Sequence, residues 1–315
     1  MGHQARMLTS NIRAWEGTFF SQENFIQAVA RAEVPNVRLL KLQSTHSPAH
    51  LFGLEYTLTH NRRRVSLAPY GLPAYPLGAC QLNESIPSLL RQLKTVRTTG
   101  FEWNVRFDHH DLARQLDHSG LSCVEATTHV LWIDRPYDEL FRRFSETARN
   151  LVRRAQRNGI VVYCATEHLE VETYYTLYEQ VIAERTKWNT IYKRPLLDEL
   201  FNIRGVKLLL AKLDENIIGG GWFIRDGSSL FYWQGTMDYK YKRYFPHHAI
   251  INSAIRYASE NGMETFNMGA SGGIQTLEQF KSFWGARKLP CWTFVWRNPM
   301  WSFVSHCRSK LRARD

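Results

Sequence analysis

Three apolar segments in the second half of the chain, joined by very short polar stretches, constrain the fold most strongly. Residues 206–213, 217–225 and 229–237 have the length and the apolar and aromatic content of strands. The connecting stretches at 214–216 and 226–227 are rich in turn-forming residues and leave room only for tight turns. These segments therefore predict an antiparallel meander of three strands.

Helical and strand-like patterns alternate along the rest of the chain. Helices are expected at 22–32, 84–98, 112–119, 136–158, 171–187, 196–201 and 246–261, and further strands at 37–43, 51–59, 102–106, 127–134, 160–165 and 265–269. This mixture predicts an α/β (α+β) fold, in which a sheet is flanked by helices.

The helix expected from Pro136 to about Asn158 has the most regular pattern, and Gly159 is placed to stop it. Its apolar side chains share one face, at Phe141, Phe144, Ala148, Leu151 and Ala155. The opposite face is basic, with Arg142, Arg149, Arg153 and Arg157. Either this is a solvated helix face, or the arginines bind an anionic ligand, since a guanidinium group suits phosphate.

The length and net charge of the chain bound its domain number and the kinds of partner that it can bind. The 315-residue chain is long enough for two domains, and its formal net charge of +11 indicates either a polyanionic partner or simple solubility. No apolar run approaches the roughly 20 residues that cross a bilayer, and the N-terminus has no signal-peptide core, so a cytoplasmic location is expected.

The five cysteines are scattered without metal-ligand spacing, so no metal site is expected. The basic stretch 308–314 is a candidate contact for tRNA or an anionic membrane.

Residues 279–286, with the sequence QFKSFWGA, hold one lysine inside an aromatic run. They follow the strand expected at 265–269 and a loop of small residues at 270–273. A lysine among aromatic rings near a strand end can be partly desolvated, and a desolvated cation stabilises an oxyanion strongly. The alternative is a solvated lysine beside core aromatic residues, with no catalytic role.

Four segments, taken in order, resemble the Gcn-five-related N-acetyltransferase (GNAT) superfamily, and within it the Fem-type transferases and the BioF-associated-like acyltransferases. They are the arginine-rich helix ending at Asn158-Gly159, the run Gly219-Gly220-Gly221, the loop 239–246, and Phe280-Lys281 with Phe283-Trp284-Gly285. In the first half, residues 19–21, 28–30 and the turn-rich loop 70–78 fit the N-terminal domain of the same family. The resemblance spans about residues 15–295.

The resemblance implies two tandem GNAT-like domains, at residues 1–135 and 136–295, each with a mixed, mainly antiparallel sheet flanked by helices. A basic tail at 296–315 follows them. In Fem-type transferases a lysine that follows phenylalanine near this strand takes part in catalysis. Carried over, this makes Lys281 the residue that stabilises the tetrahedral oxyanion and Phe280 the residue that positions the reacting chain. Arg149, Arg153 and Tyr70 become candidates for binding the donor or the substrate.

The loop before the helix at 246 departs from the GNAT pattern. A GNAT domain that uses acyl-CoA holds the pyrophosphate on backbone amides of a glycine-rich turn at this point. Residues 238–246 contain no glycine, and Pro246 lacks an amide donor. The loop is instead basic and aromatic. Tyr239, Tyr241 and Arg243 are therefore candidate donor contacts, unless the loop is simply solvated.

Together these features predict a metal-independent transferase with no permanently bound cofactor. It would move an aminoacyl group from aminoacyl-tRNA to an amine of a peptide or cell-envelope precursor. The alternative is an acyl-CoA-dependent N-acyltransferase that acts on an amino sugar or another amine. A third interpretation is a nucleic-acid-binding protein, but the apolar back of the arginine-rich helix indicates packing within a larger fold. No residue is an evident general base, since Asp238 and Glu278 are expected to be surface acids.

Overall fold

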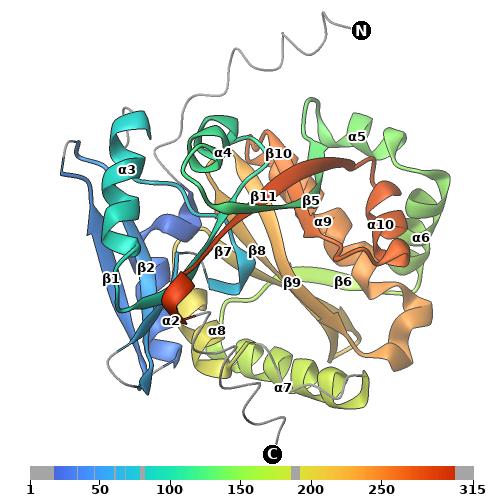
Figure 1. Cartoon of the computed structure of the whole chain (residues 1–315). Helices are drawn as coiled ribbons and strands as arrows, with labels where there is room; N and C mark the ends of the chain where they lie inside the picture. The colour runs from blue at the N-terminus through green and yellow to red at the C-terminus, as the bar shows by residue number, and fades with distance from the viewer. Residues whose placement is uncertain are drawn as a thin grey trace, which may run out of the picture.

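The computed structural model describes residues 18–301, apart from positions 34, 46, 60–61, 68, 79–81 and 186–191. In this part of the chain eleven strands form one sheet, and helices pack on both of its faces (Figure 1). The strand order is β1-β2-β3-β4-β11-β5-β10-β9-β8-β7-β6. Neighbouring strands are antiparallel except for the pairs β3–β4 and β9–β10, which are parallel. The predicted mixed, mainly antiparallel sheet flanked by helices is confirmed.

The elements have the following bounds. The strands are β1 (Val37–Gln43), β2 (His50–Thr57), β3 (Arg63–Ser66), β4 (Thr98–Val105), β5 (Ser122–Trp132), β6 (Val161–Cys164), β7 (Val206–Leu213), β8 (Asn216–Asp226), β9 (Ser229–Met237), β10 (Thr265–Ala270) and β11 (Arg287–Arg297). The α-helices are α2 (Glu23–Glu33), α3 (Leu82–Leu93), α4 (His110–Asp117), α5 (Tyr137–Arg143), α6 (Glu146–Arg157), α7 (His168–Arg185), α8 (Arg194–Phe201), α9 (Pro246–Glu260) and α10 (Gln275–Ser282). Short 3-10 helices are η1 (Phe19–Ser21), η3 (Pro69–Gly71) and η4 (Tyr239–Tyr244).

The predicted meander is confirmed as β7, β8 and β9, each within one residue of the expected bounds. Asp214 and Gly227 occupy the two turns with φ of 52° and 66°. Aspartate tolerates this left-handed conformation and glycine adopts it without steric cost, so local turn chemistry sets the register of the meander.

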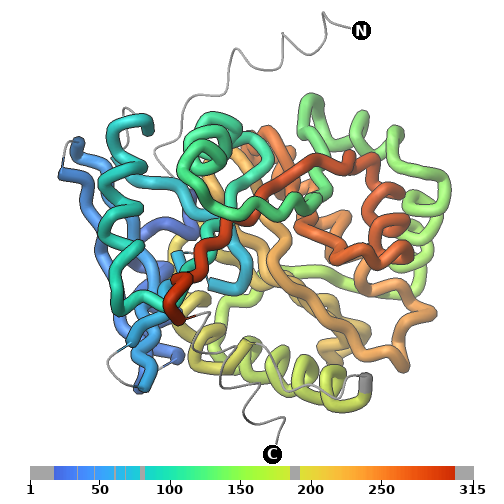
Figure 2. Tube along the Cα trace, in the orientation of Figure 1, coloured from blue at the N-terminus to red at the C-terminus, as the bar shows by residue number. Residues whose placement is uncertain are grey.

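The C-terminal strand β11 links the two halves of the chain. Residues 287–297 carry no strand pattern strong enough to predict, yet they lie in the middle of the sheet. One edge of β11 pairs with β4, and the other edge pairs with β5. Figure 2 shows the red chain of β11 running beside the green chain of β5. The sheet is therefore continuous across position 135, and the division into two domains stays a prediction.

Two groups of buried apolar side chains lie on opposite faces of β7, β8 and β9. The first group includes Trp222 of β8 and continues through α7 and α8 into the first half, where it reaches Trp103. The second group includes Phe223 of β8 and packs under α6, α9 and α10, with Phe144 and Trp284 at its centre. Since Trp222 and Phe223 are neighbours in one strand, the pleat alternation assigns one to each core.

Gly220 of β8 shows how closely the first core is packed. A Cβ atom added there would lie 2.7 Å from the Tyr174 ring and 2.8 Å from the Leu210 side chain. A side chain at this position would therefore displace α7 or β7. This explains in packing terms why a glycine run stands in an otherwise apolar strand.

The single helix expected at 136–158 is wrong, because the segment forms two helices, α5 and α6. The backbone is extended at Phe144 and Ser145, with ψ of 152° and 153°. The Ser145 hydroxyl then accepts a hydrogen bond from the Ala148 amide at 3.1 Å and caps the start of α6. Arg142 and Arg149 thus belong to different helices. The helix expected at 84–98 is also too long, since α3 ends at Leu93.

Neither a membrane span nor a metal cluster is found among the residues that the structure describes. No helix there is long and apolar enough to cross a bilayer. No group of three or more His, Cys, Asp or Glu side chains is arranged to hold a metal ion. The basic stretch 308–314 lies outside the described residues.

Candidate active site

The two parallel strands β9 and β10 pair over only three residues and then separate. Their last pair is Phe231 with Asn267. Beyond this pair β9 carries an extra residue, Trp233, relative to β8, and β10 is irregular between Asn267 and Ala270 relative to β5. Bulges of this kind re-aim side chains beside active sites, and ligands bind at the carboxyl ends of parallel strands. The point where β9 and β10 diverge is therefore the candidate active site.

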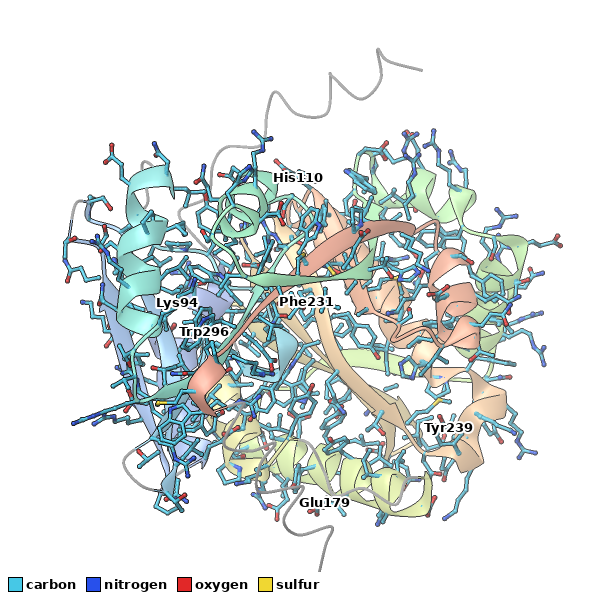
Figure 3. All side chains as sticks on the ribbon, in the orientation of Figure 1. Lys94, His110, Glu179, Phe231, Tyr239 and Trp296 are labelled. Atoms are coloured by element: carbon cyan, nitrogen blue, oxygen red, sulfur yellow. The ribbon has the colours of Figure 1, made fainter. Side chains whose placement is uncertain are left out.

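A small cavity of about 100 Å³ opens at this divergence. Its walls come from residues 71–73, the end of β4, and strands β5, β9, β10 and β11, so both halves of the chain contribute. Phe231, which lines the cavity, lies near the middle of the molecule (Figure 3). Asn267 is fixed in the wall, because its Oδ1 accepts hydrogen bonds from the Thr128 hydroxyl at 2.7 Å and the Gly269 amide at 2.9 Å.

Lys281 lies directly behind this wall. Its side chain extends from α10, and the residue is 2% exposed. The ammonium group donates hydrogen bonds to the carbonyl oxygens of Gly269 at 2.9 Å and Ala270 at 2.8 Å, which use two of its three N–H groups. Burial lowers the pKa of Lys281 to about 8, while the Glu278 carboxylate acts in the opposite direction. The interpretation of Lys281 as a solvated lysine is therefore wrong.

His129 of β5 is the second buried titratable group beside β10. It is 3% exposed, and its Nδ1 lies 3.4 Å from the Ser271 hydroxyl. Burial, and then the positive charge of Lys281, lowers the pKa of His129 below its usual range. His129 is therefore a neutral imidazole at pH 7, within the field of a buried cation.

Phe280 is partly buried and packs against the start of α9. Its ring lies 6.0 Å from His247 and 5.3 Å from His248, between ring centroids. His247 Nε2 and the Tyr232 hydroxyl of β9 are 2.7 Å apart. Burial lowers the pKa of each histidine to about 4. The two histidines are thus neutral packing partners of Phe280, and one of them is hydrogen-bonded to the diverging strand.

The loop that joins β9 to α9 has few backbone amides free to hold a phosphate. The Asp238 carboxylate accepts the Lys240 amide at 2.9 Å, and the Tyr241 amide bonds to the Asp238 carbonyl. Phe245 adopts the left-handed conformation, with φ of 61°, directly before Pro246. Its amide bonds to the Lys242 carbonyl, while Pro246 has none. The cations of this loop, by contrast, are exposed on η4.

The arginines of α6 are partly engaged within the protein. Arg149 donates to the Phe144 carbonyl at 2.9 Å and so supports the break between α5 and α6. Arg153 stacks over Phe141 at 5.6 Å. The neighbouring Arg154 stacks over Phe245 at 4.8 Å and joins α6 to the loop before α9. Arg154 therefore contacts the loop, whereas the candidates Arg149 and Arg153 contact α5 and the residue after it, and Arg149 has a structural role there.

Comparison with known proteins finds a family that part of the chain resembles. Residues 142–282 match the family described as the Acetyltransferase (GNAT) domain. The matched segment, which is less than half of the chain, is similar to a GNAT domain. GNAT domains transfer acyl groups, so the predicted enzyme class, an acyltransferase, is confirmed. No curated protein sequence matches the chain.

Solved structures share the fold over nearly the whole length, at low sequence identity. FemX is 14% identical with a TM-score of 0.67, over 91% of this chain and 94% of that one. L-PGS from Bacillus licheniformis is 12% identical with a TM-score of 0.60, over 94% and 98%. The C-terminal domain of a putative lysylphosphatidylglycerol synthetase from Agrobacterium fabrum is 14% identical with a TM-score of 0.57, over 87% and 90%. The expected GNAT-like fold, which FemX shares, is confirmed.

Tyr70 connects the first half of the chain to the strand divergence in the second half. Its backbone is left-handed, with φ of 60°, a costly conformation for a bulky residue. Its hydroxyl donates to Glu33 at 2.6 Å, and its ring lies 5.1 Å from Tyr192 and 6.4 Å from Trp233, the extra residue of β9. Tyr70 and Trp233 border the first core, whereas Tyr232, the partner of His247, borders the second. Tyr70 and His247 therefore lie on opposite sides of β9.

The structure adds three polar residues that the sequence did not single out: His129, Asn267 and Tyr232. Each stands in a strand whose pattern looks like that of any half-buried strand, so no local signal distinguishes it. They meet Lys281 and Phe280 only through the pairing of β5 with β10 and of β9 with β10. Tyr239, Tyr241 and Arg243 lie apart from this centre, on η4; Figure 3 shows Tyr239 near the edge of the molecule.

Proposed function

We propose that this protein transfers an aminoacyl group from aminoacyl-tRNA to an amine of a peptide or cell-envelope precursor. The observation that carries the proposal is the buried cation behind the divergence of β9 and β10, in a GNAT domain whose whole-chain neighbours include FemX and L-PGS. In this reaction the acceptor nitrogen attacks the ester carbonyl and an amide forms. The ester bond to the tRNA ribose breaks, and the proton of the acceptor amine passes to the ribose hydroxyl.

Lys281 would stabilise the oxyanion that forms on the attacked carbonyl. Two of its N–H groups hold the Gly269 and Ala270 carbonyls, so the charge is fixed in place before substrate arrives. A preorganised charge in a site that excludes water is the arrangement that stabilises a transition state most effectively. Phe280, held by the two neutral histidines, would position the reacting chain beside it.

A tRNA donor is supported by the loop before α9. The Lys240, Tyr241 and Phe245 amides are bonded within the loop and Pro246 has none, so the loop lacks the row of free amides that holds a CoA pyrophosphate. Its surface offers Lys240, Lys242 and Arg243 instead, close to Arg154. Side-chain cations suit the phosphates of a nucleic acid, with Arg149, Arg153, Tyr239 and Tyr241 as further contacts. Aminoacyl-tRNA is available in the cytoplasm, where the protein would act.

In this proposal residues 1–135 and 136–295 act as two GNAT-like domains that enclose one cavity. Loop 71–73 and the end of β4 come from the first, and β9 and β10 come from the second. Tyr70 would contact the substrate from the first domain, next to Trp233. The second candidate function is acyl-CoA-dependent N-acylation. It is favoured by the family description, which names an acetyltransferase.

One experiment separates the donors. The full chain is incubated with labelled aminoacyl-tRNA or labelled acetyl-CoA, each with a panel of amines that includes peptides and amino sugars. Phosphatidylglycerol is added as a hydroxyl acceptor, because one structural neighbour is a putative lysylphosphatidylglycerol synthetase. Transfer from aminoacyl-tRNA to an amine is expected. Transfer from acetyl-CoA alone would replace the proposal with the second candidate.

The role of Lys281 is tested in the same assay. Lys281→Met should reduce the transfer rate by about 10²–10³, the usual cost of removing an oxyanion-stabilising group. Lys288→Met is the matched control, since it removes a lysine that is half exposed and paired with Glu278 on the outside of the site. Equal rates for the two variants, with both folded, would remove Lys281 from the mechanism.

A further inference from the structure

A second basic surface lies in the first half of the chain, away from the loop before α9. Two adjoining hollows of about 520 and 370 Å³ share Arg62. Around them stand six arginines, which we call the arginine notch: Arg38, Arg62, Arg63, Arg64, Arg97 and Arg297. They come from β1, from β3 and the residue before it, from the segment before β4, and from the end of β11. These segments are far apart in the sequence, and the pairing of the strands brings them together.

The notch keeps an excess of positive charge after its ion pairs are counted. Glu55 is buried and pairs with both Arg38 and Arg63. Glu102 pairs with Arg64 at 3.4 Å and with Arg297 at 2.8 Å. Six guanidinium groups against these two carboxylates leave four positive charges. In the described part of the chain no carboxylate pairs with Arg62 or Arg97.

Exposed apolar side chains gather beside the same arginines. Leu58, Val96 and Met300 are 39%, 68% and 46% exposed, and they are three of the eight large apolar side chains exposed in the described residues. Trp301 completes this apolar rim, held by a hydrogen bond from its indole to the Val96 carbonyl at 2.9 Å. Arg62 stacks on the Trp301 ring at 4.7 Å. Aliphatic exposure of this kind is not explained by solubility.

We propose that the arginine notch and its apolar rim form a docking surface for an anionic lipid bilayer. Cations attract the acidic headgroups, and aliphatic and indole side chains enter the headgroup region, so each part of the surface has a matching part of the bilayer. A nucleic acid would use the arginines but would leave Leu58, Val96 and Met300 exposed to water. The apolar rim therefore decides between the two partners.

The position of the notch relative to the cavity suits this arrangement. Gly100 borders the notch and Val105 borders the cavity, and both lie on β4. At about 3.4 Å per residue the two points are about 17 Å apart along the strand. A protein docked by the notch would hold its cavity within one strand length of the membrane surface.

The test is sedimentation of the full chain with vesicles, without any substrate, so that its outcome is independent of the transfer reaction. Binding is expected with vesicles of equal parts phosphatidylcholine and phosphatidylglycerol, and not with phosphatidylcholine alone. Arg97→Glu should weaken the binding about 25-fold, because each unit of charge at an anionic surface changes affinity about fivefold. Arg114→Glu on the exposed face of α4 makes the same charge change elsewhere and should change the binding by much less.

A second pair of variants tests the apolar rim. Val96→Asp should weaken vesicle binding, whereas Leu169→Asp on α7, at 66% exposure against 68% for Val96, should have a smaller effect. Melting temperatures of all four variants establish that they fold. Equal losses for Val96→Asp and Leu169→Asp would overturn the docking surface. So would an Arg97→Glu variant that loses binding to a homopolymeric RNA while it keeps binding to the acidic vesicles.

Discussion

Replacing Lys281 with methionine gives a test of the buried cation that does not depend on the identity of the substrate. The side chain is 2% exposed, and burial lowers its pKa from 10.5 to about 8. Between about pH 8 and pH 10.5 the Lys281 side chain keeps its proton in the unfolded chain and has released it in the folded protein. The stability of the wild type should therefore rise with pH through this window. With these two pKa values, the gain from pH 7 to pH 10 is about 2–3 kcal/mol. Methionine keeps the length of the side chain but has no proton to release.

The assay is urea unfolding of the wild type and of Lys281→Met at the two ends of this window. The variant should lose about 2–3 kcal/mol relative to the wild type on going from about pH 7 to about pH 10, because all other titrating groups are common to both proteins. Lys288→Met, which removes a half-exposed lysine, controls for the loss of one positive charge. A stability difference between wild type and Lys281→Met that stays constant across the window would refute the argument. It would mean that the ammonium group is hydrated and not buried behind β10.

Three further changes test the packing around the site. Burial lowers the pKa of His247 from 6.5 to about 4, so the folded protein resists protonation and loses about 3 kcal/mol between pH 7 and pH 4. The His247→Gln variant should lose less stability than the wild type over the same pH range, as measured by unfolding at pH 7 and pH 4. An equal loss in the two proteins would place the histidine in contact with solvent. Gly220→Ala brings a methyl group within 2.8 Å of Tyr174 and Leu210, and thermal or urea unfolding should show about 1–3 kcal/mol of destabilisation. Arg106→Gln leaves the buried Asp226 carboxylate without its partner and should cost about 3–5 kcal/mol, whereas a loss below about 1 kcal/mol would show that the pair is solvated.

The fold could be predicted wherever local chemistry decides it. The meander is the best case, since apolar runs of strand length are separated by two tight turns, and its three strands lie within one residue of the prediction. The break between α5 and α6 left a weaker signal. Ser145 stands three residues before Ala148, as a capping serine does, but the continuous apolar stripe of Phe141, Phe144 and Ala148 favoured one helix. The apolar periodicity therefore led to the prediction of one helix, although the Ser145 cap could be seen in the sequence.

β11 shows what local chemistry cannot reveal. The strand contains Pro290 and begins with Arg287 and Lys288, which are poor strand formers. It is stable because β4 and β5 supply partners on both of its edges, from parts of the chain more than 150 residues away. The candidate site depends on the same long-range pairing. Lys281 and Phe280 could be found because a family resemblance marked them, whereas His129 and Asn267 reach the site only through strands β5 and β10.

The charge on Lys281 is hard to explain as structure alone. The Gly269 and Ala270 carbonyls need hydrogen-bond donors, but a neutral amide could supply them without the cost of burying an ammonium group. The lowered pKa measures the cost that remains after the Glu278 carboxylate has offset part of it, and the neighbouring His129 adds no offset, because it is neutral. Stability is thus given up at the point where β9 and β10 separate and a cavity opens. Proteins retain such costs mainly at functional sites, where a fixed charge acts on a bound substrate. The cost therefore favours a catalytic role for the charge itself, with the two hydrogen bonds serving to hold it in position.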